Sequence, residues 1–190
     1  IQCVFVFLSK LIKIYIKTFI GFILLMFTSS FCTICTDKCS YELVGLLLSL
    51  SLFHENSTIY IMCDSATQNS IKNMNPQPKL NIVWYIELDK YTNMNREKME
   101  KTNLWSEFQM AKANIMKYAL EHETDTLFLD SDIIITNKIS DIDISKELGV
   151  SPQYIKQYHL DKTGIYNGGM LWTNNKEVPN DWIKFTKTSR

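Results

Sequence analysis

The sequence predicts an α/β fold, in which a mainly parallel sheet is flanked by helices on both faces. Two observations carry this prediction: short strand-like runs recur along the chain, and helical patterns separate them. Strands that alternate with helices form βαβ units, whose crossover helices cover both faces of a parallel sheet. The strand-like runs are Phe31–Thr36, Ser57–Cys63, Leu80–Leu88 and Thr126–Ile135.

The connections between these runs follow from apolar spacing and turn residues. Tyr41–Phe53 is rich in leucine and long enough for a buried helix, with Ser40 as its expected N-cap. Asn73–Lys79 contains two prolines and is expected to be a loop. Asn95–Glu121 is expected to be one long helix, because apolar residues recur on one helix face there. Those residues are Leu104, Phe108, Ala111, Ile115 and Ala119.

Composition limits the class of protein. The 190 residues include 20 Lys+Arg and 20 Asp+Glu, and 46% are hydrophobic, which fits one globular domain. Because no basic stripe remains after the first 30 residues, no nucleic-acid partner is expected. Cys32 and Cys35 lack the second Cys pair or nearby His of a zinc site, so we expect them to be buried and reduced.

Residues 1–30 are expected to lie outside the fold. They are apolar but are interrupted by Lys10, Lys13 and Lys17, and their longest clean apolar run is Phe19–Phe27. That run is too short to cross about 30 Å of hydrocarbon as a helix. Such a segment resembles a signal peptide or weak signal-anchor, or it is upstream or non-native sequence. Membrane association is therefore possible through residues 1–30, and the protein would be cytoplasmic or membrane-anchored and lumenal.

Acidic residues follow the strand-like runs. Asp37, Asp64 and Asp89 stand at or just after the ends of the first three. Ligands bind beyond the carboxyl ends of parallel strands, but Asp is also a common turn residue, so each acid alone favours a structural role. The fourth run, TLFLDSDIIIT, places Asp130 and Asp132 inside an apolar strand. On an extended chain they share one side, with Cα atoms about 6.6 Å apart.

Four interpretations of this Asp-x-Asp pair are compatible with its surroundings. It could be a structural pair at a strand end, or the loop of a haloacid-dehalogenase-like phosphatase. That phosphatase normally has Thr or Val where this chain has Ile134, and its motif comes on an early strand. A calcium loop would need more oxygen ligands nearby. In a nucleotide-sugar enzyme, the two carboxylates would bind Mg²⁺ or Mn²⁺, which prefer hard oxygen ligands.

A glycine-rich element in the second half adds to the last interpretation. Ile165–Thr173 reads IYNGGMLWT, and three of the six glycines of the chain lie within Gly164–Gly169. Glycines beside an Asn indicate a backbone close to a ligand, or a tight turn. Together, WSEFQMAKANIMKYAL, TLFLDSDIII and YNGGMLWT resemble the GT-A-fold glycosyltransferases of the nucleotide-diphospho-sugar transferase type, akin to glycogenin, over about residues 31–185.

The resemblance implies a GT-A-type, Rossmann-like α/β sandwich over residues 31–190, which transfers a sugar from a nucleoside diphosphate donor, expected to be a UDP-sugar. It gives no indication of the acceptor. Asp132 would bind Mn²⁺ or Mg²⁺ directly, and Asp130 would contact the donor ribose or share the metal. Lys112 would reach donor phosphate or sugar, with a solvated helix lysine as the alternative.

The remaining donor-binding residues also come from the resemblance. Thr36 and Asp37 would lie by the nucleotide base, and Asn167, Gly168 and Gly169 would line the sugar or acceptor pocket. A further metal ligand, often His, would stand near the end of such a domain. Only a helix start at Trp182–Arg190 is found there, so we expect the catalytic domain to be C-terminally incomplete.

Two other functions stay open. A nucleotidyltransferase usually has a glycine-rich, basic loop after its first strand, whereas this chain has TDKCSYE, without glycine. A non-catalytic nucleotide- or sugar-binding module would need no complete metal site.

Overall fold

A computed structural model describes residues 30–140, 142–153, 157, 161 and 164–188. Within these ranges the chain forms one six-stranded sheet with the order β3-β2-β1-β4-β6-β5. The strands are β1 (Ser30–Cys35), β2 (Thr58–Cys63), β3 (Asn81–Ile86), β4 (Thr126–Leu129), β5 (Leu148–Pro152) and β6 (Tyr166–Thr173). The α-helices are α2 (Ser40–Phe53), α3 (Ser65–Lys72), α4 (Arg96–Lys101), α5 (Trp105–His122) and α7 (Glu177–Thr188), and two 3₁₀ turns are η1 (Asp37–Cys39) and η2 (Asp89–Tyr91).

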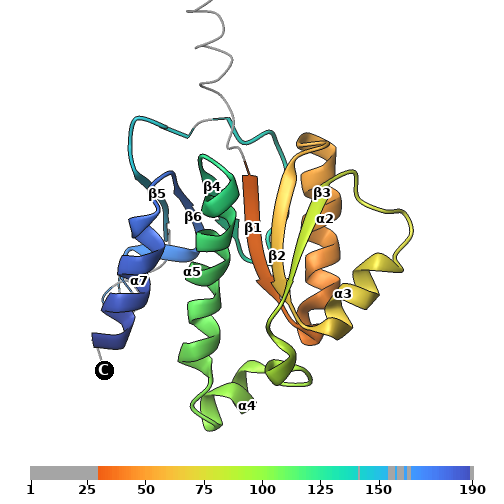
Figure 1. The fold of residues 1–190 in the computed structure, drawn as a ribbon, viewed down its shortest axis with the longest axis horizontal. Helices are drawn as coiled ribbons and strands as arrows, with labels where there is room; N and C mark the ends of the chain where they lie inside the picture. The colour runs from red at the N-terminus through yellow and green to blue at the C-terminus, as the bar shows by residue number, and fades with distance from the viewer. Residues whose placement is uncertain (1–29, 141, 154–156, 158–160, 162–163, 189–190) are drawn as a thin grey trace, which may run out of the picture.

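The sheet is mainly parallel, as predicted. β1 pairs in parallel with β2 and with β4, and β2 pairs in parallel with β3. β6 runs antiparallel to both β4 and β5. The four parallel strands therefore end at one edge of the sheet, at the lower end of the molecule in Figure 1.

Helices cover both faces of the sheet, which gives three layers (Figure 1). On one face, the leucines of α2 pack on β1, β2 and β4, including Leu43, Leu46 and Leu50. On the other face, Ile115 and Ala119 of α5 belong to a second buried cluster, together with Phe128 of β4. The predicted α/β sandwich is thereby confirmed.

Three predicted element boundaries were wrong. The expected helix Asn95–Glu121 is two helices, α4 and α5, because Asn103 adopts a left-handed φ of 58° between them. The expected strand Thr126–Ile135 ends at Leu129, because the amide of Ile133 donates to the Asp130 carbonyl across a turn, at 3.1 Å. Ser40 is the first residue of α2 instead of its N-cap.

The leader prediction falls almost wholly outside the described residues, although β1 begins at Ser30, within the predicted segment. None of the helices that the structure describes is both long and apolar enough to cross a membrane. The prediction for the cysteines is confirmed, since Cys32 and Cys35 are buried and free. Burial raises the pKa of the Cys32 thiol to about 12, so this thiol is protonated at neutral pH.

Candidate functional site

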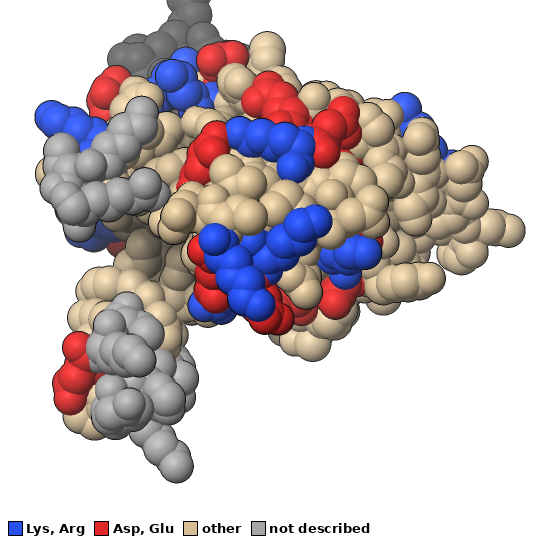
Figure 2. Space-filling view, turned by 90° about the horizontal axis from the view of Figure 1, so that it is seen from below, with Lys and Arg blue, Asp and Glu red and all other residues tan. Residues whose placement is uncertain are grey.

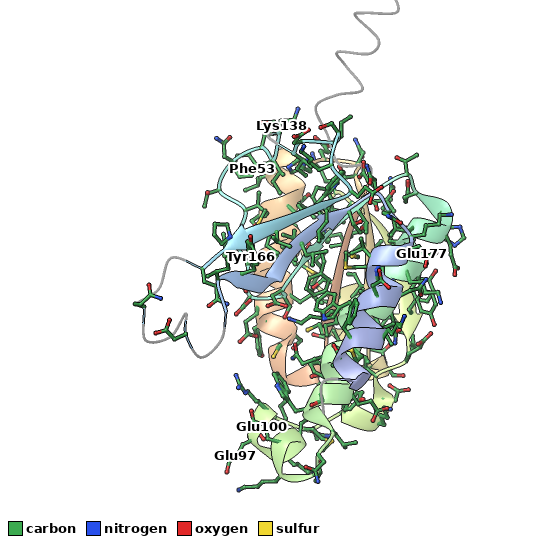
Figure 3. The ribbon with its side chains drawn as sticks, turned by 90° about the vertical axis from the view of Figure 1, so that its left-hand side faces the viewer. Phe53, Glu97, Glu100, Lys138, Tyr166 and Glu177 are labelled. Carbon is green, nitrogen blue, oxygen red and sulfur yellow. The ribbon has the colours of Figure 1, made fainter. Side chains whose placement is uncertain are left out.

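A pocket of about 370 Å³ opens at the carboxyl ends of β1 and β4, beside the first half of α5. Because β2 and β3 lie on one side of β1 while β6 and β5 lie beyond β4, this is the switch point where ligands bind in such sheets. Figure 3 shows Glu97 and Glu100 of α4 at this end of the molecule and Lys138 at the opposite end. The lining side chains come from the end of β1 and its loop, from α2, α4 and α5, and from the segment after β4.

Lys112 and Asp130 form an ion pair inside this pocket. The Lys112 Nζ lies 2.7 Å from Asp130 Oδ1, and the lysine side chain is 10% exposed. Its ammonium also lies 5.3 Å from the centre of the Phe128 ring. The alternative of a solvated helix lysine was therefore wrong. α5 places this cation at the end of β4, and its contact with donor phosphate or sugar stays a prediction.

The Asn-Gly-Gly element of β6 lies directly against Asp130. The Asp130 amide donates to the Gly169 carbonyl at 2.8 Å, and the Gly169 amide donates to Asn167 Oδ1 at 2.9 Å. A Cβ on Gly169 would stand 2.4 Å from Asp130 Oδ2, so no side chain fits there without displacing the carboxylate. Gly168, in contrast, faces open space.

A bulge at the same place explains why β6 can leave room for Asp130. Val150 pairs with Leu171, but the next residue of β5, Ser151, pairs with Asn167. The intervening residues of β6 therefore have no partner on β5. Bulges of this kind often stand beside active sites, where they redirect the chain. The two predicted groups, Asp130 and Asn167–Gly169, are thus brought together.

Asp132 differs from its neighbour. It lies in the turn that follows β4 and is exposed, so the predicted geometry of two carboxylates along one extended strand was wrong. Among the described residues, no hydrogen bond or ion pair holds its carboxylate. Its loop is fixed by backbone amides instead: Ile135 donates to Ser49 Oγ and Ile139 to His54 Nε2, both at 3.0 Å.

The two carboxylates can supply only part of a metal site. Within the part of the chain that the structure describes, no group of three or more His, Cys, Asp or Glu side chains could hold a metal ion. Mg²⁺ is commonly held by one or two carboxylates, with waters and substrate phosphates as the other ligands. The free carboxylate of Asp132 and the nearby Asp130 fit that kind of donor set.

The β1 loop contributes Thr36 and Cys39 to the pocket, but the Asp37 carboxylate points elsewhere. Asp37 is not one of the described residues that line the pocket. Its Oδ1 accepts a hydrogen bond from the Asn93 amide at 2.8 Å, and its Oδ2 lies 3.6 Å from Lys38 Nζ. Of the two residues expected by the base, the structure thus brings Thr36 to the pocket.

Sequence analysis missed several lining residues. Trp105 and Phe108 stack with ring centres 5.7 Å apart, and the Arg96 guanidinium lies 4.9 Å from the centre of the Trp105 ring. The signal was present, because Trp105 and Phe108 precede Lys112 by seven and four residues and share its helix face. The others are Ile34, Cys35, Cys39, Glu42, Gln109 and Ser131.

Both signs of charge surround this end of the molecule. Figure 2 looks onto it and shows acidic and basic side chains side by side. Several are paired, including Arg96 with Glu100 at 2.7 Å and Lys101 with Glu97 at 2.6 Å. Inside the pocket, Glu42 and Asp132 contribute to a raised pKa of the Cys39 thiol, after the larger effect of burial.

Solved structures share this architecture. The glycosyltransferase GlyE of Streptococcus pneumoniae TIGR4 matches with a TM-score of 0.57 and 16% identity, over 84% of this chain and 38% of GlyE. The bifunctional glycosyltransferase WbbM matches with a TM-score of 0.53 and 9% identity, over 81% of this chain and 33% of WbbM. Mouse xyloside xylosyltransferase 1 matches with a TM-score of 0.51 and 13% identity, over 84% of this chain and 70% of that protein.

The chain has a glycosyltransferase fold. At these identities, the glycosyltransferase fold is what the likeness establishes. The chain spans well under half of the length of the GlyE and WbbM structures that it matches. No family model matches the sequence, and no curated protein matches it.

Proposed function

We propose that the chain binds a nucleoside diphosphate sugar and takes part in transferring the sugar to an acceptor, with help from Mn²⁺ or Mg²⁺. One observation carries the proposal: in a glycosyltransferase fold, Asp130 and Asp132 stand at the end of β4 and line a pocket at the switch point of the sheet. A UDP-sugar is the donor to test first.

The residues of the pocket have distinct proposed roles. Asp132 is the direct metal ligand, because its carboxylate has no hydrogen-bonding or ionic partner among the described residues. Asp130 already balances the Lys112 ammonium, so it shares the metal or contacts the donor ribose. Lys112 keeps a positive charge at the end of β4, where the departing diphosphate would gain negative charge. A bound divalent cation would act there as a Lewis acid.

The order of the strands suggests how a donor would lie. Thr36 follows β1, the two aspartates follow β4, and Asn167 belongs to β6, so these groups succeed one another along the sheet. A donor laid across this edge would place its base by Thr36, its diphosphate by the aspartates and its sugar by Asn167–Gly169. The open space beside Gly168 leaves room for a hydroxyl-rich ring.

Calorimetric titration of uridine diphosphate, with Mn²⁺ and with a chelator, tests the proposal. Both aspartates and the diphosphate are anionic, so binding should require the cation. Asp132→Asn removes the charge of an exposed side chain and should leave stability nearly unchanged. Its Mn²⁺-dependent affinity should fall about tenfold or more, where tenfold corresponds to about 1.4 kcal/mol. Equal binding with and without metal, or by wild type and variant, would refute the proposal.

A non-catalytic nucleotide-binding module is the second candidate. Such a module would need no complete metal site, and among the described residues no third metal-ligating side chain lies with Asp130 and Asp132. Hydrolysis of a UDP-sugar with and without Mn²⁺ separates the two, since a module binds the donor without consuming it. A nucleotidyltransferase would instead consume a nucleoside triphosphate, supplied in place of the UDP-sugar in a parallel assay.

A further inference from the structure

The loops that follow β1, β2 and β3 meet at one buried carboxylate. Asp64, directly after β2, has no exposed surface. Its Oδ1 accepts a hydrogen bond from the Thr67 amide of α3 at 2.8 Å. Its Oδ2 accepts two more, from the Asp37 amide at 3.1 Å and from the Thr92 hydroxyl at 3.0 Å. These donors belong to three separate segments of the chain, so one side chain joins them.

Capping α3 does not require this arrangement. A helix N-cap needs one acceptor oxygen, which Ser, Thr or Asn supplies equally well. The second oxygen of Asp64 is used for contacts outside its own helix, and only a carboxylate accepts on both sides. Burial alone would raise the pKa of Asp64, but the hydrogen bonds from Thr67, Asp37 and Thr92 outweigh it and lower that pKa. The group is therefore ionised at neutral pH.

The Asp37 side chain forms a second link between the β1 loop and the segment after η2. Its carboxylate accepts from the amide of Asn93, the residue that follows Thr92, at 2.8 Å. Lys38 Nζ reaches Asn93 Oδ1 at 3.4 Å. The β1 loop and the segment after η2 are therefore joined in both directions. We call Asp37, Asp64, Thr92 and Asn93 the loop clasp.

The clasp holds the same loop that forms one wall of the pocket. The Cys39 amide donates to the Thr36 carbonyl at 2.9 Å, so η1 is a tight turn with Asp37 inside it. Thr36 and Cys39 at its two ends line the pocket. We propose that Asp64 is a positioning residue for nucleotide binding, which fixes the β1 loop in the shape that presents Thr36 and Cys39 to the ligand. This inference rests on the function proposed above.

Three variants separate positioning from simple stabilisation. Asp64→Asn can keep one acceptor for the Thr67 amide but turns an NH₂ group toward the donors from Asp37 and Thr92. Thr92→Val removes one of those donors at nearly constant shape. Ile71→Val is the matched control, since Ile71 is 1% exposed in α3 and has no part in the clasp. The readouts are the thermal midpoint, uridine diphosphate affinity with Mn²⁺, and the alkylation rate of Cys39 followed by peptide mass spectrometry.

Asp64→Asn should weaken nucleotide affinity about tenfold or more in the folded protein and should speed Cys39 alkylation. Thr92→Val should move both readouts in the same direction by less, and Ile71→Val should lower only the thermal midpoint. If Asp64→Asn does not fold, the comparison of Thr92→Val with Ile71→Val decides. The inference is overturned if the clasp variants lose stability alone, as Ile71→Val does. If wild type binds no nucleotide, the proposed function fails, and the alkylation rates still decide whether Asp64 fixes the loop.

Discussion

Asp64 and Asp132 both follow buried strands of the same sheet, yet they are held in opposite ways. Asp64 has no exposed surface, and its two oxygens accept from Thr67, Asp37 and Thr92. Asp132 is exposed, and among the described residues no hydrogen bond or ion pair holds its carboxylate. The backbone of its loop is fixed by Ser49 and His54 instead.

The difference shows how one sheet edge can carry carboxylates for two purposes. A buried carboxylate must have its oxygens satisfied by the protein, because an unpaired buried charge is costly. Asp64 meets that requirement and so is suited to fix loops. A loop held by its backbone keeps its side chain available, which suits Asp132 to an external cation. Asp130 is intermediate, with one oxygen paired to Lys112 and the other against Gly169.

The largest expected effect comes from removing the partner of Asp130. Lys112→Met leaves a carboxylate without its cation, and losing one partner of a buried pair costs about 3–5 kcal/mol. Because the Asp130 side chain is 35% exposed, we expect a smaller loss of unfolding free energy, roughly 2–3 kcal/mol. Chemical denaturation measures it. Adding Asp130→Asn should recover part of the loss, and strictly additive effects would show that the two side chains are not coupled.

A smaller effect is expected from replacing Gly169, the glycine that packs against the Asp130 carboxylate. Gly169→Ala puts a Cβ too close to Asp130 Oδ2, so the carboxylate must move and its ion pair with Lys112 is disturbed. Overpacking of this kind costs about 1–3 kcal/mol, and metal-dependent nucleotide binding should weaken with it. Gly168→Ala is the matched control, because no atom beyond its two chain neighbours lies within 4 Å of its added Cβ. Similar denaturation curves for the two variants would contradict the close fit between β6 and Asp130.

The sequence was enough to predict the sheet and to place acidic residues near the ends of its strands, but not to predict which groups contact each carboxylate. Apolar runs and helical spacing were enough for the parallel sheet and for a helix that carries Lys112 before the strand of Asp130, because periodic burial is local information. The turn at Asp132 and the orientation of Asp37 depend on distant partners. The backbone amide of Asn93 donates to the Asp37 carboxylate from 56 positions away. A backbone amide is present at nearly every residue, so the sequence gives no sign of this contact. Asp64 and Asp132 therefore look alike in sequence and differ in structure.

The smallest expected effect concerns the backbone support of the Asp132 loop. His54 is buried and accepts from the Ile139 amide through Nε2, which it can do only while that nitrogen is unprotonated. Burial, and then the charge of Lys138, lower the pKa of His54 below its usual 6.5. A histidine with a lowered folded pKa binds its proton more readily when unfolded. Its contribution to stability is therefore complete above pH 6.5 and declines as the pH falls below that value.

Denaturation at pH 7.5 and at pH 5.5, two values placed about one unit either side of the usual histidine pKa, measures this decline. His54→Gln offers an amide oxygen as acceptor and does not titrate, so its stability should fall less between the two values than that of wild type. Carboxylates and the other histidines titrate in both proteins, and the difference between the two declines isolates His54. Equal declines would mean that the Ile139 amide does not depend on the protonation of His54. A larger decline in wild type, with nucleotide binding that also weakens more at the lower pH in wild type than in His54→Gln, would show that His54 supports the Asp132 loop through the Ile139 amide.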